Sequence, residues 1–165
     1  LDYLDDIFGP TVTTLISNQE NISDSVRNCD LLIGAVLLAG KKAPCLVTRK
    51  MVKTMQAGSA IVDVSIDQGG AVETIRATNH DQPFYKEEEV NHYGVTNIPG
   101  DVPLTSTEAL TNVTLSYARQ IAGLGIRKSL ASSKPLRLGL NTFSGALSHK
   151  GVADAHGLSF DAYTV

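Results

Sequence analysis

The chain has 165 residues, of which 42% are hydrophobic and 19% charged, and its formal net charge is −3. This composition is typical of a globular protein with a sizeable core and excludes a disordered chain. The small negative charge, without a basic stripe, argues against nucleic acid as a partner. No apolar run approaches the ~18 residues of a membrane span. No signal-peptide pattern is present either, so we expect a soluble, cytoplasmic protein with no membrane partner.

The first predicted elements are short and alternate between helix and strand. Residues 1–8 carry apolar side chains at helical spacing, and Gly9-Pro10 supplies a stop. The β-branched run 11–16 predicts a strand, and the apolar spacing within 21–28 predicts a short helix. Since the sequence opens inside a helical pattern and without Met, we expect a fragment of a longer chain.

Three longer apolar runs predict the strands of a sheet. The runs are 31–38, 60–66 and 92–97, and a helix that Thr48 caps and Gly58 closes lies between the first two. The runs lack a clean alternation of apolar and polar residues, which predicts strands buried on both faces, as in parallel sheets. Together with 11–16 the order is βαβαβ, which predicts an open, twisted α/β sheet.

The last third of the chain has a different texture. Thr105 and Glu108 fit a capping box, followed by a helix with one apolar face that ends near Gly123 or Gly125. The residues 126–165 are irregular and polar with scattered apolar anchors, so we expect a tail that packs against something else.

Candidate site residues follow the predicted strands, where open α/β sheets bind their ligands. They are Ala35-Val36-Leu37, Asp67-Gln68-Gly69-Gly70 and Asn97-Ile98-Pro99-Gly100. Glycines permit close approach of a ligand to the backbone, and a carboxylate can exchange a proton. On periodicity alone, a cap or turn role for Asp67, beside two turn glycines, is slightly favoured over a ligand-facing role, and Asn97 could equally be a turn residue. We expect Asp63, inside the strand, to be a structural partner.

Cysteine and histidine spacings indicate no metal site. Cys29 and Cys45 are expected to be reduced structural thiols, and the four histidines to have surface or capping roles. No Gly-x-Gly-x-x-Gly motif is present, and Glu87–Glu89 is expected to be a solvated loop.

Several motifs in order resemble alanine dehydrogenase, in a family that also contains the α-subunit of nicotinamide nucleotide transhydrogenase. They are Asp30–Leu37 (DLLIGAVL), Lys42-Ala43-Pro44, Ile61–Gly70 (IVDVSIDQGG), His92-Tyr93, Asn97–Gly100 and Pro103–Asn112. The resemblance covers essentially the whole chain, but only the C-terminal part of the family's chain. Two departures are Ala71, where the family usually has Cys, and Ile98, where it usually has Met.

The resemblance implies an NAD-dependent, reversible oxidative deamination of L-alanine to pyruvate and ammonia. It makes Asp67 a catalytic group beside the nicotinamide, with a histidine from upstream of Leu1 as the other. It places Asn97 and the Val36-Leu37 loop near the nicotinamide and its ribose, and Ser17 near the adenosine. The cofactor-binding residues that it implies are Ser17, Val36, Leu37, Val64, Asp67, Asn97 and Ile98.

The resemblance also implies two domains and an oligomer. Residues 1–103 would be the C-terminal half of an NAD-binding Rossmann domain, and 104–165 a helix and tail returning to the substrate domain. The family assembles as hexamers, and a fragment that lacks the upstream groups is expected to be inactive. Two alternatives remain: the transhydrogenase α-subunit, which typically has Gln-Asn in place of Asp67-Gln68, and a non-catalytic NAD-binding or assembly module.

Overall fold

The computed structural model describes residues 1–38 and 40–164. The chain divides into two compact units. The first comprises Leu1–Val36 and Ala43–Thr96, and the second comprises Leu37–Lys42 and Asn97–Val165. Within the described residues, every helix is too short or too polar to cross a membrane.

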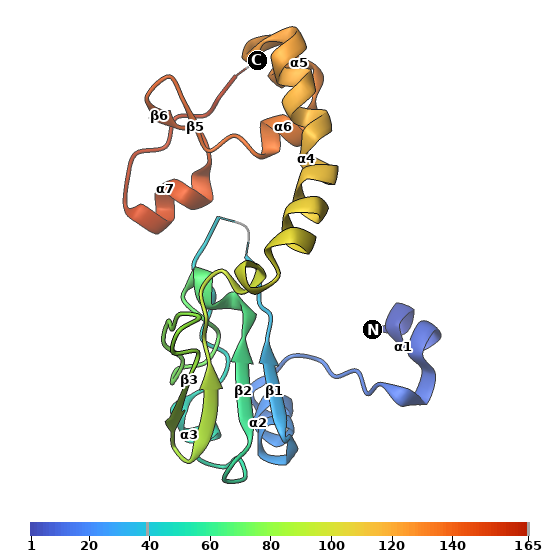
Figure 1. The fold of residues 1–165 in the computed structure, drawn as a ribbon, viewed down its shortest axis with the longest axis vertical. Coiled ribbons are helices and arrows are strands. Elements are labelled where there is room, and N and C mark those ends of the chain that lie inside the picture. The colour runs from blue at the N-terminus through green and yellow to red at the C-terminus, as the bar shows by residue number, and fades with distance from the viewer. Residues whose placement is uncertain (39, 165) are drawn as a thin grey trace. The chain divides into compact units, whose positions relative to one another are not determined.

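The first unit is built on a four-stranded sheet (Figure 1). Its strands are β1 (Leu31–Gly34), β2 (Ala60–Asp63), β3 (Phe84–Glu87) and β4 (Val90–Tyr93), in the spatial order β1-β2-β4-β3. β1, β2 and β4 are parallel, and β3 pairs antiparallel to β4. The prediction of an α/β fold with a parallel sheet is therefore confirmed, while the edge hairpin strand β3 was not predicted.

The helices of the first unit are short. They are α1 (Asp2–Phe8), α2 (Gln19–Asn28) and α3 (Arg49–Val52), with the 3₁₀ turns η1 (Gly9–Thr11) and η2 (Val64–Gln68). The Asn18 side chain caps α2 by accepting the amide hydrogen of Asn21 at 2.8 Å. The helices predicted over 1–8 and 21–28 are confirmed, the second beginning two residues earlier.

Two predictions for this unit are wrong. The predicted strand over 11–16 does not form: Thr11 is the last residue of η1, and within the described residues the segment after it pairs with no strand. Leu15 and Ile16 are exposed. Thr48 does cap a helix, with Oγ1 3.3 Å from the amide nitrogen of Met51, but that helix ends at Val52 rather than near Gly58. Beyond it, residues 54 and 55 donate to carbonyls three residues back, so the backbone tightens into turns.

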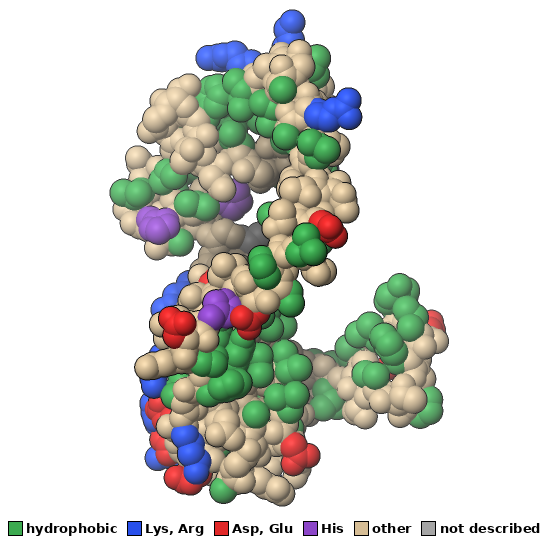
Figure 2. Space-filling model, viewed as in Figure 1, with side chains coloured by type: hydrophobic (Ala, Val, Ile, Leu, Met, Phe, Trp, Pro, Cys, Tyr) green, Lys and Arg blue, Asp and Glu red, His purple; other side chains and the backbone are tan. Residues whose placement is uncertain are grey.

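The core of the first unit lies between α2, α3 and one face of the sheet. It consists of Val26, Val47, Met51, Val52, Met55, Ile61, Val72 and Val90. On β1, by contrast, Leu31 is 52% and Ile33 61% exposed. Figure 2 shows hydrophobic side chains gathered over the strands of this unit. The expectation of strands buried on both faces is therefore wrong for β1 within the described residues.

A polar cluster is buried beside this core on β4. His92 is fully buried, with Nδ1 2.9 Å from the carbonyl oxygen of Val90 and Nε2 2.8 Å from Oγ1 of Thr74. Because a carbonyl only accepts, Nδ1 carries the hydrogen and Nε2 accepts from the threonine hydroxyl. The Tyr85 ring stacks on the imidazole at 5.0 Å, and burial raises the pKa of this tyrosine. The expected surface or capping role is thus wrong for His92.

The acidic run forms the turn between β3 and β4. Glu88 and Glu89 both have positive φ, 51° and 61°, as in a two-residue type I′ hairpin turn. The Arg49 guanidinium lies 2.5 Å from a carboxylate oxygen of Glu87 and 2.9 Å from one of Glu88. The hydrogen bond to Glu88 is the largest cause, and that to Glu87 the second, of a raised pKa of Arg49. Glu87 and Glu88 are half-buried, so the expectation of a solvated loop is wrong for them.

The second unit is mostly helical. It contains η3 (Ile98–Asp101), α4 (Pro103–Leu124), α5 (Ile126–Ser132), α6 (Lys134–Leu138), the hairpin β5 (Thr142–Phe143) and β6 (Ala146–Leu147), and α7 (Lys150–His156). The tail is therefore less irregular than the sequence indicates. Helix α4 ends before Gly125 as predicted, but it begins at Pro103, so the Thr105 capping box does not form. None of the side chains of α4 is buried.

Replacing Glu89 by Gly is expected to stabilise the first unit relative to replacing it by Ala. Both variants lose the exposed ion pair with Lys86, but only Gly relieves the left-handed backbone at this position. The difference should be about 1 kcal/mol in the free energy of unfolding, measured by urea titration. Equal stabilities of the two variants would show that the turn is unstrained.

The variant Thr74→Val is expected to lower the free energy of unfolding by roughly 1–3 kcal/mol, because Nε2 of buried His92 loses its donor. The matched control is Thr111→Val on exposed α4, where the threonine hydroxyl donates to the carbonyls of Thr107 and Glu108 of the same helix. That change should be nearly neutral in the same titration. A neutral Thr74→Val variant would contradict the assigned hydrogen bond.

Candidate functional site

The candidate site lies at the carboxyl edge of the sheet in the first unit. Because β1, β2 and β4 are parallel, their carboxyl ends share one edge. Residues 35–36 follow β1, and η2, which carries Asp67, follows β2 directly.

The last residue of β2, Asp63, organises this edge. Its carboxylate is fully buried and accepts four hydrogen bonds. Oδ1 accepts from the amide and hydroxyl of Ser65 at 2.9 and 2.7 Å. Oδ2 accepts from the amides of Ala71 and Val72 at 2.6 and 3.2 Å. The carboxylate is thus bonded by backbone and hydroxyl donors, which confirms the expected structural role of Asp63.

Two glycines give this carboxylate its space. A Cβ on Gly34 would lie 3.0 Å from Cγ of Asp63. A Cβ on Gly70, whose φ is +75°, would lie 2.3 Å from Cγ2 of Ile75 and 3.1 Å from Oδ2 of Asp63. Only glycine therefore fits at position 70, for reasons of packing as well as backbone conformation.

The turn that carries Asp67 is closed by backbone hydrogen bonds. The amide of Gly70 donates to the carbonyl of Ser65 at 3.0 Å, and the amide of Ala43 donates to the carbonyl of Gln68 at 2.8 Å. Asp67 lies between these closures with its side chain exposed to solvent. The turn interpretation of Asp67 is therefore confirmed, and its catalytic role stays a prediction.

Gln68, one of the predicted site residues, and Ser65, which the sequence reasoning missed, add two further features to this edge. Within the described part of the chain, the buried Oε1 of Gln68 has no hydrogen-bond partner, which marks an unused acceptor beside Asp67. The hydroxyl of Ser65 accepts from the amide of Val36 at 3.2 Å and so ties the turn to the loop after β1. In the sequence, the only signal for this hydrogen bond was the position of Ser65, a polar residue two positions after Asp63 at the end of the strand.

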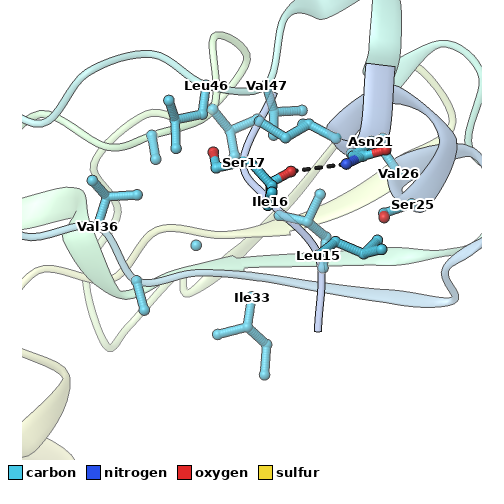
Figure 3. A pocket seen from close by; sticks show the side chains of 16 residues that line it. Leu15, Ile16, Ser17, Asn21, Ser25, Val26, Ile33, Val36, Leu46 and Val47 are labelled. Carbon is cyan, nitrogen blue, oxygen red and sulfur yellow. Dashed lines mark hydrogen bonds between the residues drawn. The ribbon is translucent and has the colours of Figure 1, made fainter. Parts of the chain in front are cut away.

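A pocket of about 290 Å³ opens beside the carboxyl end of β1 (Figure 3). Its lining is mostly apolar and comes from residues 15–17, 21–22, 25–26, 32–36, 46–47 and 71–72. Ser17 and Val36, two of the predicted cofactor-binding residues, both line it. Asn21 donates from Nδ2 to the carbonyl of Ile16 at 2.9 Å, which fixes the segment that carries Ser17. Val64 and Asp67, on the neighbouring turn, do not line this pocket.

The other predicted residues belong to the second unit. Leu37 is exposed, and Asn97 precedes η3 with a φ of 55°, a left-handed conformation that asparagine tolerates well. Asn97 lines a pocket of about 690 Å³ at the start of α4, together with Pro99 and Ser106. Ile98 begins η3 and is half-buried.

The chain is similar to known dehydrogenases over most of its length. It is 55% identical over 161 residues to an alanine dehydrogenase of Methanococcus maripaludis, with 97% of this chain and 43% of that relative covered. It is 58% identical over 154 residues to an alanine dehydrogenase of Bacillus subtilis, with 93% of this chain and 41% of the relative covered. The chain thus spans less than half the length of these relatives.

The same similarity holds for the fold. A solved structure named L-alanine dehydrogenase matches with a TM-score of 0.81 and 46% sequence identity, over 94% of this chain and 43% of that chain. The family model described as alanine dehydrogenase/PNT, C-terminal domain, matches residues 1–150. The chain therefore belongs to the alanine dehydrogenase/PNT C-terminal domain family.

Proposed function

We propose that these residues form part of an NAD-dependent alanine dehydrogenase, which converts L-alanine and water reversibly to pyruvate and ammonia. The observation that carries the proposal is the exposed carboxylate of Asp67, on a turn closed onto the carboxyl edge of a parallel sheet. The identity of 55% and 58% to proteins named alanine dehydrogenase supports it.

In this proposal Asp67 accepts and donates protons during the reaction. NAD, when bound, supplies the acceptor for the hydride that leaves the α-carbon of alanine. Oxidation at that carbon gives an imine, and water adds to it with loss of ammonia. The carboxylate of Asp67 accepts a proton from the amine or the attacking water and returns it to the leaving group.

The pocket beside β1 supports binding of part of the cofactor. A volume of about 290 Å³ is just below that of typical ligand pockets, which run from about 300 to 1,000 Å³, and suits one end of a dinucleotide. The Ser17 hydroxyl offers a polar group in a mostly apolar lining, as an adenosine requires. Val36, Leu37, Val64, Asn97 and Ile98 are proposed for the nicotinamide end on the family resemblance.

The remaining expectations extend the proposal to the whole protein. Residues 1–103 would complete a Rossmann domain with upstream chain, and 104–165 would return to the substrate domain. A hexamer in the cytoplasm is proposed on the same basis. The transhydrogenase alternative is disfavoured by Asp67-Gln68, because that relative typically has Gln-Asn there.

The test is a chimaera in which this chain replaces the matching part of the Bacillus subtilis relative. The unmutated chimaera should reduce NAD when alanine is added. Asp67→Asn keeps the size of the side chain but removes the base, so kcat should fall roughly 10²–10⁴-fold, followed by NADH absorbance. Asp24→Asn, an exposed carboxylate on α2 outside the pocket, is the matched control and should leave kcat unchanged. Near-normal turnover of Asp67→Asn would contradict proton transfer by this residue, and an inactive chimaera would favour a non-catalytic module.

The 165-residue chain by itself is expected to be inactive and to bind NAD weakly, because it spans only 41–43% of its relatives. The measurements are alanine-dependent NADH production and calorimetric titration with NAD. The unmutated chimaera, assayed in parallel, is the positive control. Turnover by the isolated chain would mean that its own residues suffice for the reaction.

A further inference from the structure

We propose that Asp63 is a positioning residue for Asp67, an inference that rests on the proposed function. The buried carboxylate of Asp63 holds both ends of the turn on which Asp67 lies, and through Ser65 it also orders the loop after β1. It does so without exchanging a proton itself.

The contacts of the carboxylate fall on both sides of Asp67 in the sequence. Oδ1 binds Ser65 before it, and Oδ2 binds the amides of Ala71 and Val72 after it. One buried group thus closes a loop whose middle carries the exposed side chain of Asp67. Hydrogen bonds to an ionised acceptor are stronger than those between neutral groups, so this closure is stiff.

The surroundings fix where the carboxylate lies. Gly34 and Gly70 approach it so closely that a Cβ on either would lie 3.0–3.1 Å from its atoms. The missing Cβ atoms thus leave the space that the carboxylate occupies, and a side chain at either position would displace it.

The same group reaches the loop after β1. Ser65 donates its hydroxyl to Oδ1 at 2.7 Å and accepts the amide of Val36 at 3.2 Å. Val36 lines the pocket proposed for the cofactor. The spacing between the proposed acid/base group and this pocket wall is thus set by one chain of hydrogen bonds. Since a misplacement of ~1 Å can cost ~10²-fold in rate, this spacing matters for turnover.

The experiment is a double-mutant cycle in the chimaera, with Asp63→Asn made alone and in the Asp67→Asn background. Asparagine has the same size, but its NH₂ group would face an amide or hydroxyl donor. With Asp67 present, kcat should fall about 10- to 100-fold while KM for NAD and alanine change less than about threefold. With Asp67→Asn, the residual turnover should fall less than about twofold, because the group to be positioned is already lost.

A merely structural role gives a different pattern. In that case Asp63→Asn lowers kcat by the same factor with and without Asp67. Alternatively, the fall in kcat disappears at low temperature, where circular dichroism shows that the variant and the unmutated chimaera are both fully folded. Either result overturns the inference, as does unchanged turnover. If the turnover of the Asp67→Asn chimaera is too low for the effect of Asp63→Asn on it to be measured, the low-temperature comparison decides.

Gly34→Ala is the second variant and replaces Asp63→Asn if that protein fails to fold. It removes no hydrogen-bonding group but brings a Cβ to 3.0 Å from the carboxylate, so it displaces Asp63. It should lower kcat only when Asp67 is present. An unmutated chimaera without turnover would overturn the proposed function and this inference together, whereas an active chimaera with an additive cycle overturns this inference alone.

Discussion

The buried carboxylate of Asp63 is the interaction on which the carboxyl edge of the sheet depends. An ionised carboxylate away from water is very unfavourable unless donors replace the water. Here four donors do so, two from Ser65 on the turn that follows β2 and two from the amides of Ala71 and Val72 after it. The closure of that turn and the link through Ser65 to the loop after β1 both follow from satisfying this one group.

The strands of the first unit could be predicted where local apolar content decides. The runs 31–38, 60–66 and 92–97 each contain or overlap a strand of the parallel sheet. The run 11–16 has similar β-branched content but forms no strand, because β-propensity describes how well a residue fits a half-buried, paired surface. Pairing partners are not visible in a local pattern, and neither is the exposed face of β1.

The misjudged polar residues show the same limit. His92 is buried because Thr74 and the carbonyl of Val90 satisfy both ring nitrogens, and Tyr85 stacks on it from the opposite position of β3. These partners cannot be predicted from the spacing of residues along the sequence. The acidic turn is similar, since its position depends on Arg49 of α3, far away in the sequence. Residue type predicts average exposure, whereas register and helix packing decide individual exposure.

At the candidate site, sequence reasoning found the right stretch but assigned the glycines incompletely. Bare backbone was expected for a ligand, yet at position 70 glycine is required by Ile75 and Asp63. The two carboxylates of IVDVSIDQGG are then distinguished by their hydrogen bonding. Asp63 could stop accepting hydrogen bonds only if those from Ser65, Ala71 and Val72 were broken, so it is unsuited to proton exchange during turnover. Asp67 reaches solvent on the turn that Asp63 holds, so the proposed chemistry falls to the exposed carboxylate and its geometry to the buried one.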